Sequence, residues 1–414
     1  MTQLLSLSQS EKELKTSGGW ITATARRLED FDDVERLVIV SVNRELKEDK
    51  KVSDGKKIVY FIKADQVSIK RDLNLEKKLS EIIKNEQPDV IDVQGVEFSF
   101  GNSLINCNID IPFCVTLQGF ASSCAKVYTK GVPLKELLLG RTKNDNRHLK
   151  GIFERKIFMY IRHIKEKRII RKAKYCIGRT HFDKAEAKKI NPDIKYFSCN
   201  RFLRSDFYSY KWDVQKTEKH KIFGIQSGVP YKGLHYAIKV IAKLKESYPD
   251  IVLEVPGGFR IDEPLSTITS YPKYIGELID EYNVRENIKF LPPLNPEQMA
   301  QHLMTSRVFY QYSLIENSPN SLAEAQIMGV PVVASDVGGT SSYVEDGVSG
   351  ILFESDNIDE CVENISRIFE DDELCLRLAD NEKKIALERH NIKINTEKLF
   401  SIYQDILKDY RNLA

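Results

Sequence analysis

Short runs rich in valine and isoleucine alternate with longer amphipathic segments along most of this chain. In the first half, the runs lie at residues 36–42, 57–62, 89–95, 112–119, 174–178 and 194–199. Such alternation is the pattern of parallel β-strands that are joined by crossover helices. The first half therefore predicts an α/β domain built on a parallel sheet.

A second series of such runs begins after a polar stretch that contains a tryptophan, residues 210–220. Its members lie at residues 221–226, 250–257, 288–291, 307–312, 331–335 and 350–353. We place a boundary near residues 205–218 and predict two doubly wound α/β domains, followed by a helix over 395–413. Before the first series only residues 4–8 indicate a strand, so either the first strand is degenerate or the chain starts late.

Composition excludes several classes of protein. The 414 residues include 62 basic and 60 acidic side chains, a net charge of +2, so no overall field favours nucleic acid as a partner. The seven cysteines show no spacing typical of a metal site. No apolar stretch of about 18 residues could span a bilayer. We expect a cytoplasmic protein that needs neither a metal nor another cofactor.

Two glutamates, Glu316 and Glu324, stand around an Asn-Ser-Pro-Asn-Ser stretch that follows the strand predicted at 307–312. Ligands of open parallel sheets bind at the carboxyl ends of the strands, so this loop should face a ligand. We expect Asn317 or Ser318 to cap a helix that Gly329 ends, with a proline in its first turn. Both carboxylates could then face one ligand, beside backbone N–H groups that suit phosphate.

Residues 316–339, ENSPNSLAEAQIMGVPVVASDVGG, together with 344–353, resemble the donor-site signature of the family 4 retaining glycosyltransferases, group 1, with the GT-B fold. The resemblance implies two Rossmann-like domains facing across a cleft. It implies that Glu324 binds the ribose hydroxyls of a nucleotide sugar and Glu316 the hydroxyls of the transferred sugar. It further implies that Asn317 and Ser318 hold the diphosphate.

Residues 227–258 carry a second resemblance to this family, which identifies Lys232 as the lysine that binds the diphosphate. Many relatives have an arginine five residues before this lysine, where this chain has Ser227. One usual cation is therefore absent. Residues 178–208 resemble a subgroup associated with surface polysaccharides, and within them Arg179 is our candidate to replace the missing cation. An ion pair with a structural role is the alternative for Arg179.

The first half carries looser marks of the same family. Gly19 and Trp20 resemble the glycine-rich loop that lies against the diphosphate and the acceptor. Gln118 stands where relatives often have a histidine beside the reacting sugar; it could form hydrogen bonds there or belong to a structural turn. Glu97 is a candidate to bind or polarise the acceptor. We expect His181 to start a helix.

Residues 147–174 are strongly basic, with eleven lysines or arginines against two glutamates. The segment could be a helix that packs on the first domain. Its apolar neighbours would also suit anionic lipid head groups or a lipid-linked diphosphate acceptor. We do not expect nucleic acid, because no recognition motif accompanies the charge.

Together these features predict an enzyme that moves a sugar, with retention, from a nucleotide-diphosphate sugar to a glycan or lipid-linked acceptor in polysaccharide or glycoconjugate biosynthesis. Residues 1–212 would form the acceptor-side domain, 218–392 the donor domain, and 393–414 a helix that crosses back to the first. The enzyme would be cytoplasmic or peripheral at the inner face of the membrane. An epimerase of the same fold and a catalytically silent sugar-binding relative are the alternatives.

Overall fold

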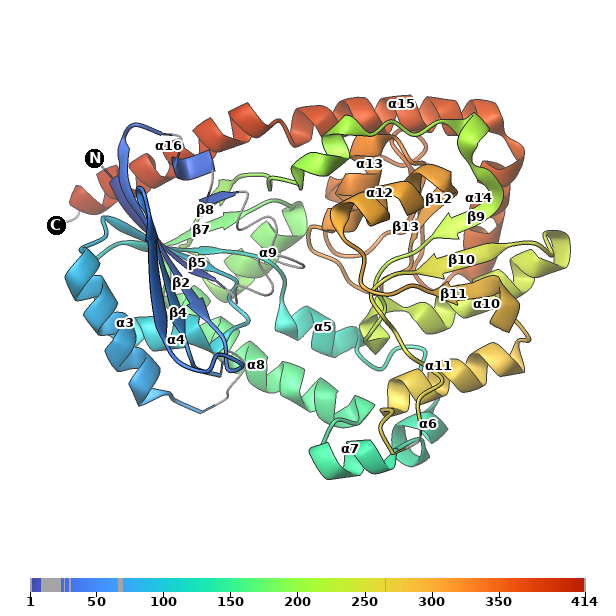
Figure 1. Ribbon diagram of the computed structural model, residues 1–414, viewed down its shortest axis with the longest axis horizontal. Coiled ribbons are helices and arrows are strands. Elements are labelled where there is room, and N and C mark those ends of the chain that lie inside the picture. Colours follow the sequence, from blue (N-terminus) through green and yellow to red (C-terminus); the bar gives the residue numbers. More distant parts are fainter. Residues whose placement is uncertain are drawn as a thin grey trace. The chain divides into compact units, whose positions relative to one another are not determined.

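The computed structural model describes residues 2–8, 24–25, 27–29, 31–65, 70–264 and 266–412. The chain divides into two compact units (Figure 1). Unit 1 comprises Met1–Ala121, Ile161–Leu203 and His390–Ala414, and unit 2 comprises Ser122–Tyr160 and Arg204–Arg389. The units therefore do not follow the order of the chain. Residues 122–160 belong to unit 2, although they lie between two segments of unit 1, and the last 25 residues belong to unit 1 again.

Unit 1 contains an eight-stranded sheet in the order β3-β4-β2-β1-β5-β6-β7-β8. The strands are β1 (Thr2–Ser8), β2 (Val34–Val42), β3 (Lys50–Asp54), β4 (Lys57–Ile62), β5 (Val90–Gln94), β6 (Phe113–Thr116), β7 (Tyr175–Gly178) and β8 (Lys195–Ser198). All pairs are parallel except β3–β4. The six strands predicted in this half are confirmed. The degenerate first strand exists as β1, which pairs with both β2 and β5.

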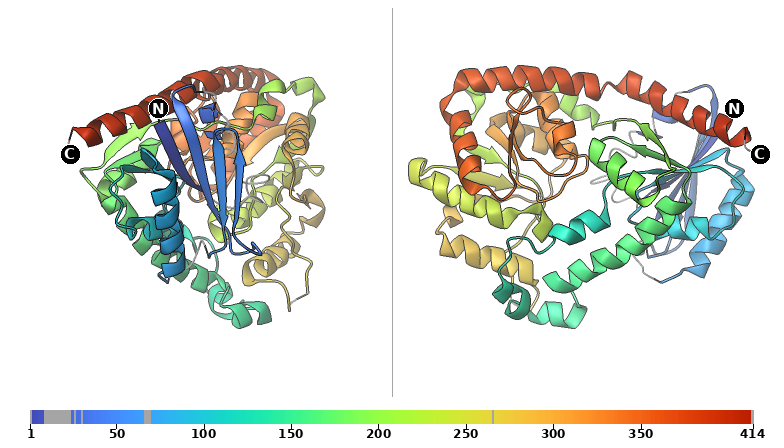
Figure 2. Two further views of the ribbon diagram at one scale, coloured as in Figure 1. Left: turned by 60° about the vertical axis from the view of Figure 1, so that its left-hand side comes forward. Right: turned by 180° about the vertical axis from the view of Figure 1, so that it is seen from behind.

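The side chains of β2 alternate between two hydrophobic cores, one on each face of this sheet. Val38, Val40 and Val42 belong to a core that also holds residues of α3 (Leu73–Glu86) and α8 (Ile152–Lys172). Leu37 and Ile39 belong to a core that holds residues of α16 (Ile392–Arg411). Successive residues of a strand point to opposite faces, so a strand buried on both sides needs a continuous apolar run. Figure 2 shows α16 and α3 on either side of these strands.

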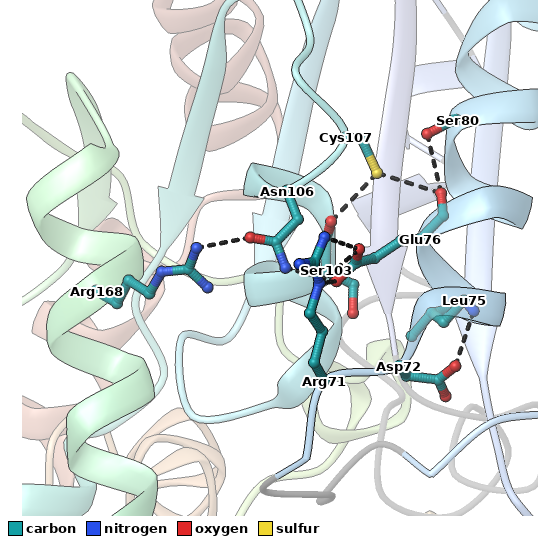
Figure 3. A network of polar contacts seen from close by, with 9 residues as sticks. All are labelled: Arg71, Asp72, Leu75, Glu76, Ser80, Ser103, Asn106, Cys107 and Arg168. Carbon is teal, nitrogen blue, oxygen red and sulfur yellow. Dashed lines mark hydrogen bonds and ion pairs between the residues drawn. The ribbon is translucent and has the colours of Figure 1, made fainter.

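Helices flank the sheet of unit 1, and a polar network joins three of them. The helices are α3 (Leu73–Glu86), α4 (Ser99–Ile105), α8 (Ile152–Lys172), α9 (His181–Ile190) and α16 (Ile392–Arg411), of which α8 begins within unit 2. Glu76 on α3 accepts two hydrogen bonds from Arg71 Nε and one from Asn106 Nδ2 (Figure 3). Asn106 Oδ1 in turn accepts from Arg168 on α8 at 2.6 Å.

Unit 2 contains a six-stranded parallel sheet in the order β11-β10-β9-β12-β13-β14. Its strands are β9 (Glu218–Phe223), β10 (Val252–Val255), β11 (Ile288–Phe290), β12 (Ser306–Gln311), β13 (Val332–Ser335) and β14 (Ile351–Phe353). The six strands predicted in this half are therefore confirmed. The order of the strands reverses between β9 and β12, and such a switch point is where doubly wound sheets bind ligands.

Helices cover both faces of the unit 2 sheet, where α10 packs against α14 and α13 against α15 (Figure 1). The α-helices are α5 (Ala121–Val127), α6 (Leu134–Leu139), α7 (Lys143–His148), α10 (Leu234–Ser247), α11 (Ser270–Glu281), α12 (Pro296–Thr305), α13 (Asn320–Met328), α14 (Ile358–Glu370) and α15 (Asp372–Arg389). The 3-10 helices are η1 (Ser205–Ser209), η2 (Val214–Lys216), η3 (Pro230–Lys232), η4 (Arg285–Asn287) and η5 (Thr340–Ser342).

Hydrogen bonds explain why residues 122–160 pack with unit 2. The Asp145 carboxylate, buried at the start of α7, accepts from the backbone N–H of Ser270 at 2.8 Å. Thr142 Oγ1 donates to the Ile268 carbonyl at 2.8 Å. The buried His235 ring lies 2.9 Å from the Lys130 carbonyl through its Nε2. These contacts join polar groups far apart in sequence, which periodicity alone does not reveal.

Candidate functional site

The loops that follow β9, β12 and β13 meet at the carboxyl edge of the unit 2 sheet. Leu314 N–H, after β12, donates to the Tyr231 carbonyl in η3 at 2.9 Å. Gly339 N–H, after β13, donates to the Glu316 carbonyl at 3.0 Å. The three loops are thus connected through their backbones, which fixes the positions of the side chains that they carry.

Two glycines allow these loops to approach so closely. Gly233 has φ +75°, and a Cβ there would lie 2.1 Å from the Tyr312 carbonyl oxygen. Gly338 has φ +58°, and a Cβ there would lie 2.1 Å from the Glu316 carbonyl oxygen. Any other residue would clash with the backbone and adopt an unfavourable conformation, so only glycine fits either place.

Lys232 and Glu316 form an ion pair where these loops meet. Lys232 Nζ donates to Glu316 Oε1, which also accepts from Ser313 Oγ at 2.7 Å. The Lys232 side chain is 27% exposed and that of Glu316 is 13% exposed, so the pair is partly open to solvent. The structure therefore brings together two of the residues that the sequence predicted for the donor site.

Helix α13 starts one or two residues later than predicted, because the sequence analysis offered Ser318 or Asn317 as its cap. Its N-cap is Pro319, with ψ 110°, and no side chain caps it; Gly329 ends it with φ +82°, as predicted. Our expectation that Asn317 or Ser318 caps this helix was wrong, because extended backbone at Pro319 moves the first helical residue to Asn320. Ser318 is 7% exposed and its Oγ has no hydrogen-bond partner in the described part of the chain. A buried free hydroxyl beside a helix N-terminus suits an anionic ligand.

Glu324, inside α13, forms a buried ion pair with Arg204. Its two carboxylate oxygens accept from Arg204 Nε at 2.7 Å and Nη2 at 2.6 Å, and its side chain is only 4% exposed. Burial raises the pKa of Glu324, and the hydrogen bonds from Arg204 act in the opposite direction. Arg204 thus joins the segment before η1 to α13. A ribose would have to use the lone pairs of Glu324 that Arg204 leaves unoccupied.

Ser227, which stands in place of the usual arginine, is fully buried. Its hydroxyl donates to the Ile225 carbonyl at 2.8 Å and lies 2.7 Å from the Tyr312 hydroxyl. This serine therefore forms part of the protein interior. Sequence reasoning identified the missing cation but not its neighbour Tyr312, which nothing in the motif indicates.

The remaining predicted residues belong to unit 1. Gly19 and Trp20 lie outside the described residues. Gln118 follows β6 and is half-buried. Arg179 follows β7; its Nη1 donates to the Leu117 carbonyl, and its backbone N–H donates to Asp183 Oδ2 at 2.9 Å. Since Arg179 and Ser227 belong to different units, the replacement of one cation by the other stays a prediction.

The capping geometry of α9 confirms the prediction that His181 starts a helix. The helix begins at His181, and Thr180 and Asp183 form a reciprocal capping box at its start. The buried Asp183 carboxylate also accepts from the Tyr196 hydroxyl. His181 is thus a residue at a helix start, and Asp183 fixes the loop after β7.

Glu97 follows β5 with a half-buried carboxyl group whose Oε2 atom has no hydrogen-bond partner among the described residues. Burial raises its pKa to about 7, although the charge of Arg162 opposes the rise. A carboxyl group with a pKa near neutrality could exchange a proton with an acceptor hydroxyl. The sequence identified Glu97, but its proton affinity depends on the packing around it.

The pKa of Glu97 predicts a specific dependence of stability on pH. Its pKa is higher in the folded than in the unfolded state, so its contribution is present below about pH 4.5 and is lost as pH rises towards 7. Because glutamine does not ionise, the free energy of unfolding of Glu97→Gln should fall by up to about 3 kcal/mol less than that of the wild type as the pH rises. Thermal unfolding at pH 5 to 8 measures the difference, with the exposed Glu35→Gln as the control. Equal pH profiles for wild type and Glu97→Gln would contradict the raised pKa.

The sequence and the fold both match known glycosyltransferases. Residues 209–385 match the family model "Glycosyl transferases group 1". The chain has the GT-B fold. Sucrose-phosphate synthase from Thermosynechococcus elongatus superposes with a TM-score of 0.75 over 99% of this chain and all of that one, at 13% identity. The Anabaena protein Alr3699/HepE, in complex with UDP and glucose, superposes with a TM-score of 0.67 over 98% of this chain and all of that one, at 15% identity.

Two related enzymes each match less than half of this chain. The D-inositol 3-phosphate glycosyltransferase of Corynebacterium urealyticum is 27% identical over 42% of this chain and 40% of its own length. The enzyme of the same name from Mycolicibacterium smegmatis is 28% identical over 44% of this chain and 39% of its own length. The chain thus spans about two fifths of the length of these relatives. The residues that match the family model lie within unit 2.

Proposed function

We propose that this protein is a retaining, metal-independent glycosyltransferase that uses a nucleotide-diphosphate sugar. The observation that carries the proposal is the Lys232–Glu316 ion pair, held partly open beside the start of α13 by three connected loops. In this proposal Lys232 neutralises the leaving diphosphate, and Glu316 accepts hydrogen bonds from hydroxyls of the transferred sugar. Positive charge at the leaving group stabilises the transition state without a metal ion.

Four further residues have roles in donor binding under this proposal. Backbone N–H groups at Asn317 and Ser318, with the free Ser318 hydroxyl, bind the diphosphate. Glu324, oriented by Arg204, accepts hydrogen bonds from the ribose hydroxyls. Arg179 supplies the cation that Ser227 cannot. UDP complexes of the Anabaena protein support a nucleotide donor of this kind.

The acceptor side of the reaction belongs to unit 1 in this proposal. Gln118 donates or accepts hydrogen bonds near the reacting sugar, and Glu97 binds or polarises the acceptor hydroxyl. The acceptor is a glycan, a lipid-linked sugar or a phosphorylated polyol, and the names of the inositol phosphate relatives favour the last of these. A role in polysaccharide or glycoconjugate biosynthesis is consistent with each.

Incubation of the protein with a panel of nucleotide sugars, with and without acceptors, tests this function. We expect one donor to release nucleoside diphosphate, and a suitable acceptor to accelerate the release. Anomeric analysis of the product by NMR should show retention, and activity should persist in EDTA. An isomerised donor without release would instead indicate an epimerase, and binding without turnover a silent relative.

We also propose that helix α8 attaches the enzyme to an anionic membrane surface. Within the described residues no helix is long and apolar enough to cross a membrane. Four apolar residues spaced four, three and four apart, and thus on one face of α8, are exposed: Phe153 (54%), Ile157 (44%), Tyr160 (46%) and Ile164 (68%). A helix face of this kind can insert at the level of lipid head groups.

Charge around this stripe favours anionic lipid. The four acidic residues between 134 and 172 are buried or half-buried, whereas all exposed lysine, arginine, aspartate and glutamate residues of this segment are basic. Glu154 pairs with Arg141, and Glu166 accepts from the Ala121 N–H at 2.6 Å. The exposed basic residues are Lys135, Lys143, Arg147, Lys150, Arg168, Arg171 and Lys172. Each could add about 1 kcal/mol of attraction to an anionic surface.

Vesicle flotation tests this attachment. The wild type should float with vesicles that contain phosphatidylglycerol and remain in solution with pure phosphatidylcholine. Phe153→Ser combined with Ile157→Ser should reduce flotation at least about tenfold, because it removes half of the apolar stripe. Leu376→Ser combined with Leu387→Ser, which changes exposed leucines on α15, is the matched control. Equal flotation of both double variants would exclude α8 as the attachment site.

A further inference from the structure

The loop that carries Gln118 is anchored at both of its ends within unit 1. At the end of β6, Leu117 N–H donates to a backbone carbonyl of β7 at 2.9 Å. At the start of α5, Ala121 N–H donates to Glu166 Oε2 at 2.6 Å. Between these anchors the loop borders open space, because a Cβ at Gly119 would meet no atom within 4 Å outside the adjacent residues. Gln118 therefore stands on a short loop whose position depends on the two anchors.

Glu166, on α8, is a costly choice for such an anchor because its side chain is fully buried. Its Oε2 accepts from Ala121, and its Oε1 lies 2.8 Å from His163 Nδ1, one turn earlier on the helix. The exposed fraction of the Glu166 side chain is 0%, and that of His163 is 17%. Burying a carboxylate is unfavourable unless hydrogen bonds compensate it, whereas an apolar side chain would fill the place without this cost. Packing alone therefore does not explain a glutamate here.

Glu166 also acts on Glu97, the other residue of unit 1 that we assign to the acceptor side. Burial raises the pKa of Glu97 to about 7; among the neighbouring charges, Arg162 and Arg201 lower this pKa and Glu166 raises it. Arg162, on the same helix, also donates through Nε to the Glu97 carbonyl at 3.2 Å. Helix α8 thus contacts the loop after β5 and the loop after β6, which carry Glu97 and Gln118.

We propose that Glu166 is a positioning residue for the acceptor side of glycosyl transfer. It holds the Gln118 loop through the Ala121 N–H, and its negative charge favours a proton on Glu97, while Glu166 itself does not contact the substrate. The inference rests on the proposed transferase function, because Gln118 and Glu97 serve an acceptor only in that reaction. No motif indicates this role, since Glu166 lies in the basic segment, 45 positions from Ala121 in sequence.

Hydrogen exchange measures the contact directly. In Glu166→Ala the Ala121 amide should exchange at least about tenfold faster, because it loses a charged acceptor. Glu166→Gln keeps an acceptor oxygen and should stay within about threefold of the wild type. Glu397→Ala removes an exposed glutamate from α16 in the same unit and should leave this exchange unchanged. Unchanged exchange in Glu166→Ala would overturn the proposal.

Kinetics with UDP-glucose and D-inositol 3-phosphate, or with the pair that the donor panel selects, separate positioning from general damage. Glu166→Ala should lower kcat/KM for the acceptor at least about tenfold and leave the affinity for UDP unchanged. Glu166→Gln should recover most of kcat/KM but change its pH profile. Because glutamine carries no charge to raise the pKa of Glu97, the limb of the profile that Glu97 sets should move to lower pH. That limb is identified by its absence in Glu97→Gln.

Two checks keep the result decisive. Circular dichroism should show that Glu166→Ala is folded; if it is not, the nearly isosteric Glu166→Gln decides through the pH profile. An equal loss of UDP affinity and of kcat/KM in Glu166→Ala would overturn the proposal, as would an unshifted profile in Glu166→Gln. Absence of transfer by the wild type would refute the transferase and with it this role, whereas unchanged exchange at Ala121 in an active enzyme would refute the role of Glu166 alone.

Discussion

Replacing Glu316 by alanine is expected to lower kcat for glycosyl transfer at least about 100-fold. The carboxylate would contact the sugar that develops positive charge as the diphosphate leaves, so its contribution is larger in the transition state than in the ground state. Its loss also frees Lys232 and Ser313, which both donate to Glu316 Oε1 in this structure. Release of nucleoside diphosphate in the presence of acceptor measures the effect.

The matched control is Glu363→Ala, which removes an exposed glutamate from α14 in the same unit. It should keep the kcat of the wild type. Lys232→Ala should resemble Glu316→Ala in kcat but should weaken nucleoside diphosphate binding more, because the lysine contacts the leaving group itself. A Glu316→Ala enzyme with unchanged kcat would remove this residue from the reaction.

Glu324→Ala is expected to destabilise unit 2 by about 3–5 kcal/mol, because it leaves the Arg204 guanidinium unpaired inside the protein. For a unit of this size, the change corresponds to a fall in Tm of roughly 10 °C. Donor affinity should also fall, about tenfold or more, since ribose hydroxyls would lose their acceptor. Differential scanning calorimetry and nucleotide titration below the lowered Tm measure the two effects separately.

A double variant distinguishes the structural role of Glu324 from its role in binding. Glu324→Leu with Arg204→Met replaces the buried ion pair by two apolar side chains of similar size, which often restores stability. We expect Tm to recover most of its loss while donor affinity stays low. Recovery of donor affinity as well would show that Glu324 acts only by holding the fold.

Local patterns in the sequence predicted the fold well. Contacts between residues that are far apart in sequence did not enter those predictions. The strands of both sheets and the strand-loop-helix around Glu316 follow from local periodicity and turn residues. Strand β3 was not predicted, because its five residues are all exposed and lie at the sheet edge. Its sequence therefore lacks the apolar run of a buried strand. The predicted N-cap of α13, Asn317 or Ser318, was wrong by one or two residues, because the backbone at Pro319 is extended.

The candidate site divides in the same way. The motif predicts Lys232 and Glu316 close together, because both follow strands at one edge of a sheet, and the structure shows them as an ion pair. The motif could not reveal that Arg204, which is 120 residues from Glu324 in sequence, neutralises it. Nor could it reveal the hydrogen bond between the hydroxyls of Tyr312 and Ser227. The packing of residues 122–160 with unit 2 likewise rests on single polar contacts such as Asp145 with Ser270, which have no local signature.

The bond from Tyr403 on α16 to Asp92 on β5 has a consequence for how the protein folds. These residues are 311 positions apart, so ribosomes that make 5–20 residues per second complete Tyr403 about 15–60 seconds after Asp92. Until then one face of the unit 1 sheet lacks the α16 side chains that complete its core. We expect the newly made strands to need protection from aggregation during this interval.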